Sequence, residues 1–182
     1  MNYVEPIRDI NLLENICDYL ESTNTRNYLL FMMGIYTGLR VSDILRLKVK
    51  DVKDKDYLTI REQKTNKQKI IKLNPILKRA LKKYLVSRES KEFLIKSRQG
   101  YNNPIDRTRA YQILKDIGEA FGIENLGTHS MRKTFGYHYY RKSKDVVTLQ
   151  KIFNHSSPSV TLHYIGIIQD DLNKAYSNLK YY

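Results

Sequence analysis

The spacing of apolar residues predicts a helical first part of the chain. Asp9 is a suitable N-cap for a helix that runs to about residue 21. A second helix is predicted from about Arg26 to Tyr36. Its Tyr28–Gly34 segment is apolar on most sides, so we expect it to be the central buried helix. Ser42 then suits the N-cap of a short helix whose apolar residues, Ile44, Leu45 and Leu47, face inward.

The period of the pattern changes after residue 49. Leu58 and Ile60 alternate with polar neighbours, and so do Ile71 and Leu73 on the other side of a basic turn, Lys64–Lys67. Alternation on both sides of a polar turn predicts a β-hairpin. Residues 48–52 are a candidate third strand of the same sheet.

Helical signals return in the second half of the chain. The pair Asn74-Pro75 opens a helix to about residue 87, residues 93–95 are short and extended, and residues 99–104 form a loop. Asp106 caps a helix to about residue 121, and Asp170 is a candidate cap for a last helix, residues 171–179. We therefore predict a mainly α domain with a small antiparallel β-sheet.

Polar residues gather at element boundaries between residues 129 and 164. His129 and Arg132 are three apart at a predicted helix start, so both side chains project from one face. His155 follows an apolar helix end, where Asn154 suits a left-handed cap. Ser157-Pro158 then starts the helix that carries Tyr164. An arginine, two imidazoles and a phenol in one pocket suit nucleophilic attack on a phosphate.

Composition supports a polyanionic partner. The 182 residues include 32 Lys and Arg against 19 Asp and Glu, a net charge of +13. Such an excess favours nucleic acid or an anionic membrane. No apolar run approaches the roughly 18 residues of a membrane span, and the start of the chain lacks the pattern of a secretory signal. The single cysteine, Cys17, excludes an internal disulfide and a thiolate zinc site, and we expect it to be a core thiol.

Four segments together resemble the catalytic domain of the tyrosine recombinases, the family of phage-type and transposon integrases and chromosome-dimer resolvases. The segments are T-G-L-R-V-S-D-I-L, K-T-N-K, H-S-M-R-K-T-F and N-H-S-S-P-S-V-T-L-H-Y. They occur in the family's order, and the resemblance runs from about Asn27 to Ile165. It implies metal-independent DNA strand cleavage and rejoining through a covalent 3′-phosphotyrosyl intermediate, with no cofactor.

The resemblance also implies a role for each matching residue. Arg40 and Arg132 correspond to the two catalytic arginines, Lys64 to the hairpin lysine, His129 and His155 to the two imidazoles and Tyr164 to the nucleophile, while Asp43 corresponds to the carboxylate that supports Arg40. A phenol is a poor nucleophile at neutral pH, so we expect the neighbouring cations and an imidazole to favour its ionisation. The basic neighbours Lys67 and Lys133 are candidate DNA contacts, and Lys67 is the alternative to Lys64 as proton donor.

The sequence departs from the family pattern at three places. Asn154 stands where the family usually has Gly, and Lys133 stands where many members have His. About 25 residues before Asn27 are too few for the family's N-terminal DNA-binding domain, so we expect residues 1–182 to be a single catalytic domain.

These departures leave alternatives open. One is a non-catalytic DNA-binding relative, a regulatory or decaying copy, and another is a type IB topoisomerase with the same chemistry. The expected partners are double-stranded DNA and, through a tail of about residues 170–182, other copies of the chain. The expected location is the cytoplasm, at the nucleoid.

Overall fold

The computed structural model describes residues 4–180, and its first two helices are those that the sequence predicts. Helix α1 (Ile10–Thr23) is capped by the carboxylate of Asp9, and helix α2 (Thr25–Thr37) is buried along most of its length. Gly38 ends α2 in the left-handed conformation, with φ of 63°. A Cβ atom there would lie 2.6 Å from the ring of Phe135, so the position requires glycine for space as well as for conformation.

The segment after α2 differs from the prediction in two details. Helix α3 (Val41–Leu45) has Arg40 at its N-cap, so Ser42 lies inside the helix and does not cap it. Residues 49–52 form helix α4 (Val49–Val52) instead of a third strand, and only Lys48 makes an isolated bridge, to Phe93. Val49 and Val52 are both buried, which a helical turn with an i, i+3 pair achieves on one face.

The predicted hairpin is confirmed. Strands β1 (Tyr57–Arg61) and β2 (Gln68–Lys72) pair antiparallel, with Leu58 opposite Ile71 and Arg61 opposite Gln68. Helix α5 (Pro75–Tyr84) follows, capped by Asn74. An isolated two-stranded hairpin is only marginally stable, so its position depends on what the strands and the turn contact.

The second half is helical. Helices α6 (Arg107–Phe121), α7 (Thr128–Ser143), α8 (Val146–Phe153), α9 (Pro158–Tyr164) and α10 (Ile167–Ser177) follow in order. Asp106 caps α6, Ser157 caps α9, and Asn154 ends α8 with φ of 54°, all as predicted. The predicted cap of the last helix is wrong, because α10 starts after Gly166 and Asp170 lies within it.

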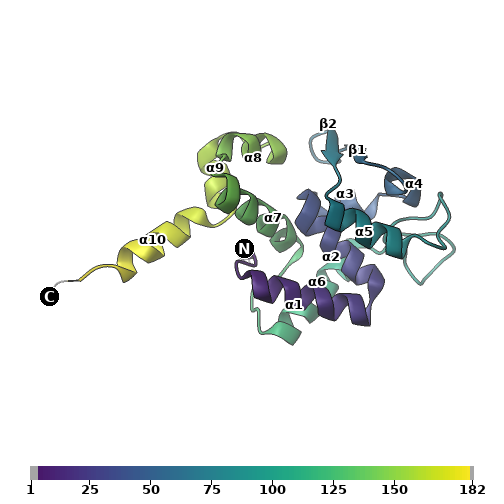
Figure 1. Ribbon diagram of the computed structural model, residues 1–182, viewed down its shortest axis with the longest axis horizontal. Coiled ribbons are helices and arrows are strands. Elements are labelled where there is room, and N and C mark those ends of the chain that lie inside the picture. Colours follow the sequence, from purple (N-terminus) through teal and green to yellow (C-terminus); the bar gives the residue numbers. More distant parts are fainter. Residues whose placement is uncertain (1–3, 181–182) are drawn as a thin grey trace.

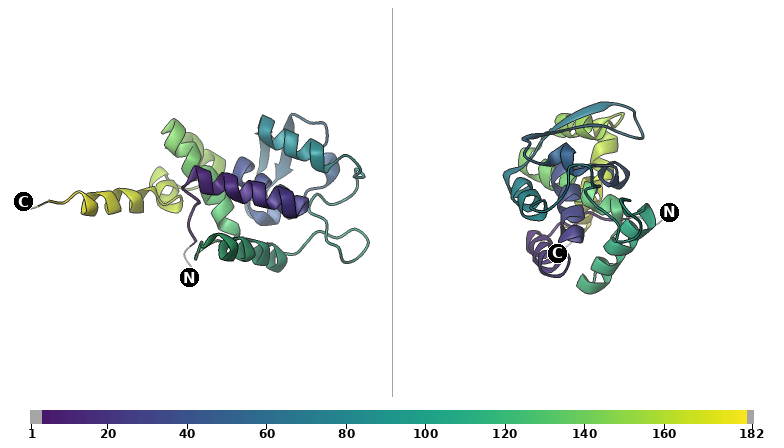
Figure 2. Two further views of the ribbon diagram at one scale, coloured as in Figure 1. Left: turned by 60° about the horizontal axis from the view of Figure 1, so that its bottom comes forward. Right: turned by 90° about the vertical axis from the view of Figure 1, so that its right-hand side faces the viewer.

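The predicted fold class, mainly α with one small antiparallel sheet, is confirmed. The largest core cluster surrounds α2, and a second cluster joins α7, α8 and α9 around Phe153. In Figure 1 the hairpin and α8 both lie along the top of the molecule, while α10 extends away from the body. The left view of Figure 2, from a different direction, also shows α10 projecting from the body. Within residues 4–180, no helix is long and apolar enough to cross a membrane.

Candidate active site

Arg132 is a buried arginine in the first turns of α7. Only 2% of its surface is exposed, and its guanidinium lies 4.2 Å from the centre of the Phe153 ring. One terminal nitrogen donates to the carbonyl of Gly38 and the other donates to the carbonyl of Phe153 at 3.0 Å. Both carbonyls belong to helix ends, which lack intrahelical donors. Arg132 therefore joins the ends of α2 and α8 and is held in place by them.

Arg40 lies at the start of α3, next to the tight turn at Gly38. Its Nη1 atom is 3.3 Å from a carboxylate oxygen of Glu62, which lies directly after β1. The side chain of Arg40 is 18% exposed, whereas that of Glu62 is 0% exposed. Arg40 is thus oriented by a buried carboxylate and still faces solvent in part.

Tyr164 is the last residue of α9 and is partly buried. Its hydroxyl lies 3.4 Å from Nδ1 of His129. Burial raises the pKa of Tyr164, and this outweighs the charges of Arg132 and Arg40, which lower it. The cations therefore favour ionisation of the phenol, as expected, but burial outweighs them in the protein without DNA. The hydroxyl keeps its proton at neutral pH and needs a base to remove it.

Two imidazoles flank this tyrosine. The ring of His155 lies 5.0 Å from that of Tyr164, and its Nδ1 atom is 3.1 Å from the hydroxyl of Thr161. Burial, with the charges of Arg132 and Arg40, lowers the pKa of His155 to about 4. Burial also lowers the pKa of His129, as do the charges of Arg132 and other nearby cations. Both imidazoles are consequently neutral at pH 7 and able to accept a proton.

A cavity of about 440 Å³ is lined by His129, the residue that contacts the tyrosine hydroxyl, whereas Tyr164 itself is not part of its lining. Its lining brings together four of the six predicted catalytic residues with five neighbours: Arg40, Val41, Ser42, Gln63, Lys64, Arg107, Thr128, His129 and Arg132. His155 lines a second pocket, of about 420 Å³, with Lys67 and residues of the α8 end. Residues from both halves of the chain thus form one cationic site. Among residues 4–180, no group of three or more His, Cys, Asp or Glu side chains is placed to hold a metal ion.

Three further predicted residues lie at the edges of this site. Asp43 is buried, but it accepts a hydrogen bond from the backbone N–H of Gln63 at 2.9 Å, and the carboxylate that contacts Arg40 is Glu62. Lys67 is exposed at the turn, as a DNA contact requires.

Lys133 does not fit the DNA contact predicted for it. It is only 6% exposed, and its ammonium group lies 5.2 Å from the centre of the Tyr164 ring. We therefore do not propose Lys133 as a DNA contact.

The sequence profile described as "Phage integrase family" matches residues 8–169, most of the chain. The chain belongs to the phage integrase family. A curated relative, "Probable integrase/recombinase YoeC" of Bacillus subtilis (strain 168), is 46% identical over 176 residues, which cover 97% of each protein. "Tyrosine recombinase XerA" of Thermococcus kodakarensis is 26% identical, and the match covers 92% of this chain and 60% of XerA.

Solved structures confirm the fold of a tyrosine recombinase catalytic domain. A crystal structure of XerA recombinase has a TM-score of 0.76 at 23% identity, covering 100% of this chain and 66% of that one. A post-cleavage complex of XerH recombinase with its difH substrate has a TM-score of 0.71 at 20% identity, covering 97% and 54%. A DNA-bound dimer of lambda integrase has a TM-score of 0.69 at 18% identity, covering 91% and 60%.

Three residues of this phage integrase family member were not predicted for the site: Glu62, Lys69 and Arg107. Glu62 contacts Arg40, Lys69 contacts Glu62 at 3.0 Å, and Arg107 lines the cavity. The alternation of inward and outward positions along the strands could have predicted two of them, Glu62 and Lys69. Glu62 continues the inward set of Leu58 and Ile60, and Lys69 continues that of Ile71 and Leu73, so alternation alone places two opposite charges inside.

Proposed function

We propose that this chain cleaves and rejoins double-stranded DNA at specific sites, with Tyr164 as the nucleophile and without a metal ion. The observation that carries the proposal is the Tyr164 hydroxyl, 3.4 Å from Nδ1 of His129, with the charge of Arg132 acting to lower the pKa of the phenol. The cavity beside His129 has the cationic lining that a phosphodiester requires.

In the proposed reaction the oxygen of Tyr164 attacks the scissile phosphorus, and the bond from phosphorus to the 5′ oxygen breaks. His129 accepts the phenolic proton as general base. Arg40 and Arg132 stabilise the charge that develops on the non-bridging oxygens. His155, whose ring lies 5.0 Å from that of Tyr164, completes the phosphate site.

Lys64 supplies the proton that the departing 5′ oxygen needs. It lines the cavity from the hairpin turn, opposite the helix that carries His129. The products are a 3′-phosphotyrosyl link and a free 5′ hydroxyl. Because no bond energy is lost to water, the same steps in reverse rejoin a strand.

The partners follow from charge and from the shape of the C-terminal end. A net charge of +13 favours DNA through its phosphates, and Lys67 at the exposed turn is a candidate contact. Helix α10 extends from the body with Leu172 and Tyr176 exposed, which suits contact with a second copy on DNA. We further propose that the chain works on DNA of the nucleoid, in the cytoplasm.

The decisive experiment is capture of the covalent intermediate. A nick placed shortly 3′ of the cleavage site lets the small fragment that bears the free 5′ hydroxyl diffuse away after cleavage. The strand then cannot be rejoined, so the protein–DNA adduct accumulates. The parent protein should give a band that resists SDS and is digested by protease, and Tyr164→Phe should give none. Tyr139→Phe, which removes a hydroxyl from α7, is the matched control and should give the band. DNA binding without an adduct from the parent would favour the non-catalytic alternative.

A further inference from the structure

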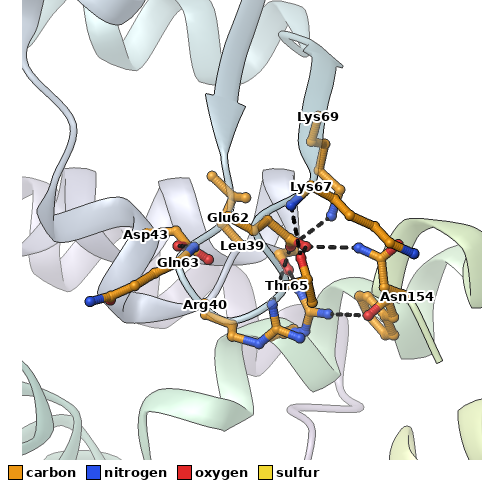
Figure 3. Close-up of polar contacts among 12 residues, drawn as sticks. Leu39, Arg40, Asp43, Glu62, Gln63, Thr65, Lys67, Lys69 and Asn154 are labelled. Atoms are coloured by element: carbon orange, nitrogen blue, oxygen red, sulfur yellow. Dashed lines mark hydrogen bonds and ion pairs between the residues drawn. The ribbon is translucent and has the colours of Figure 1, made fainter.

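Glu62 is a buried carboxylate at the point where strand β1 enters the hairpin turn. One of its oxygens contacts Arg40 at 3.3 Å and Lys69 at 3.0 Å. The other accepts hydrogen bonds from Thr65 at 2.8 Å and from Nδ2 of Asn154 at 2.7 Å. Figure 3 shows these contacts converging on Glu62 from the α2–α3 turn, the hairpin and the end of α8. Burial raises the pKa of Glu62, but its hydrogen bonds and the charges of Lys69 and Arg40 lower that pKa by more than burial raises it. The net pKa is therefore below the ordinary value, and the carboxylate is ionised.

A second bond runs in parallel between the hairpin and α8. The ammonium group of Lys69 donates to the backbone carbonyl of Ile152 at 2.6 Å, in the last turn of α8. Carbonyls at a helix end have no intrahelical donor, so a cation suits this position. Two polar bonds, Asn154 to Glu62 and Lys69 to Ile152, therefore join segments that lie 92 and 83 residues apart in the sequence.

Two further contacts hold the turn on the side away from α8. The backbone N–H of Gln63 donates to the buried carboxylate of Asp43 at 2.9 Å, and Arg107 donates to the side chain of Gln63 at 3.4 Å. Gln63, Lys64, Asn66 and Lys67 are all exposed, and the sheet has only two strands. Glu62 closes the turn through its backbone, since its N–H donates to Lys67 O and its carbonyl accepts from Asn66 N, both at 2.9 Å. The same residue thus closes the turn and attaches it to α8.

We propose that the hydrogen bond between Asn154 and Glu62 is a latch that holds the hairpin turn against α8 and so places Lys64 in the catalytic cavity. Both are positioning residues: they act through Lys64, two residues after Glu62. The placing of Lys64 for catalysis rests on the proposed function, whereas the attachment of the hairpin turn to α8 does not. The structure also gives Asn154 a purpose beyond its left-handed backbone, because a glycine there would supply the conformation but not the amide donor.

Asn154→Gly isolates the latch. Glycine adopts the backbone conformation of Asn154, φ of 54°, without strain, so the variant removes the amide and leaves the end of α8 intact. Lys144→Gly is the matched control. Lys144 caps α7 with φ of 58°, is exposed, and lies outside the site, so the same replacement of a left-handed residue is made without touching the latch.

The first measurement is amide hydrogen exchange in the protein without DNA. Loss of a hydrogen bond to a charged group should raise the exchange rates of the Glu62 and Asn66 amides by about tenfold in Asn154→Gly. Lys144→Gly should leave both rates unchanged. Unchanged rates in Asn154→Gly would overturn the latch.

The second measurement tests whether the latch acts through Lys64. On an ordinary phosphodiester, single-turnover cleavage by Asn154→Gly should be about tenfold slower than by the parent. On DNA whose bridging 5′ oxygen is replaced by sulfur, the two rates should agree within about twofold, because a thiolate leaves without a proton. Equal slowing on both substrates would refute the positioning role. A parent protein that forms no adduct would refute the proposed function instead, and hydrogen exchange would then decide the latch alone.

Discussion

The Nδ1 atom of His129 lies 3.4 Å from the hydroxyl of Tyr164, a residue 35 positions later in the chain. The contact joins the first turn of α7 to the last residue of α9. Because burial raises the pKa of Tyr164 while that of His129 is lowered, the pair holds its proton on the phenol at neutral pH. In the proposed reaction, proton transfer to His129 therefore accompanies attack on the phosphate.

Replacing His129 should expose this dependence. His129→Ala should slow adduct formation by about 10²–10⁴, the usual contribution of a general base. Added imidazole should restore part of the rate, because His129 lines the cavity and its removal leaves room there. Tyr164→Phe should not respond to imidazole. A His129→Ala variant with the parent's rate would remove His129 from the mechanism.

The two arginines should differ in their effect on stability. Arg40→Ala and Arg132→Ala should each slow cleavage by about 10²–10³ or more, the cost of losing one donor to a developing oxyanion. Only Arg132→Ala should also lower the free energy of unfolding strongly, by about 2–4 kcal/mol, because the buried carbonyls of Gly38 and Phe153 lose their donors. Thermal unfolding of the two variants checks this, and equal losses of stability would contradict the structural role of Arg132.

The roles of Lys64 and Lys67 should be distinguishable by comparing cleavage of substrates with an oxygen or a sulfur leaving group. Lys64→Ala should cleave an ordinary phosphodiester slowly and recover on a substrate with a bridging 5′ sulfur. Lys67→Ala should weaken DNA binding and show no recovery specific to sulfur, because Lys67 lines the second pocket with His155. The reverse pattern would move the proton donor to Lys67.

Acid should destabilise the protein through His155. Its pKa is about 4 in the folded protein, below the ordinary value of 6.5. Between these values the unfolded chain binds more protons, so this stability is present above pH 6.5 and is lost as the pH falls through 4. After allowance for solvent screening, we expect a loss of about 1–2 kcal/mol.

Chemical unfolding at pH 7 and at about pH 4.5 measures this loss. His155→Gln should reduce the pH dependence, and His163→Gln, at an exposed position of α9, should not. The same pH dependence in His155→Gln and in the parent would show that another group is responsible.

Helix α10 should carry self-association without carrying catalysis. Leu172, Tyr176 and Leu179 are 47%, 77% and 58% exposed, whereas Asp170 is bound to Arg8 of the body at 3.0 Å. Leu172→Ser with Tyr176→Ser should therefore abolish multimers on DNA while changing single-turnover cleavage by less than about threefold. Sedimentation of the DNA complexes checks the first expectation. Multimers that survive the change would place the interface elsewhere.

The sequence by itself determined the elements and the chemical groups of the site. Capping residues such as Asp9, Asp106 and Ser157 set helix starts through bonds to nearby backbone N–H groups, and Asn154 ended α8 for an equally local reason. Predictions from local sequence signals were wrong where burial or the backbone determined the structure. Val49 and Val52 belong to a helix because a helical turn buries both, and α10 starts after Gly166, which has no side chain to act as a cap.

Only the tertiary structure decided which of these groups meet. Arg40 pairs with Glu62 and not with Asp43, Lys133 is buried beside Tyr164, and Lys69 reaches a carbonyl of α8. These partners lie many residues apart, and a choice between two nearby carboxylates depends on distances and burial that no local pattern encodes. The pKa of Tyr164 shows the same limit, because nearby cations are visible in the sequence whereas the burial that outweighs them arises only when α7, α8 and α9 pack together.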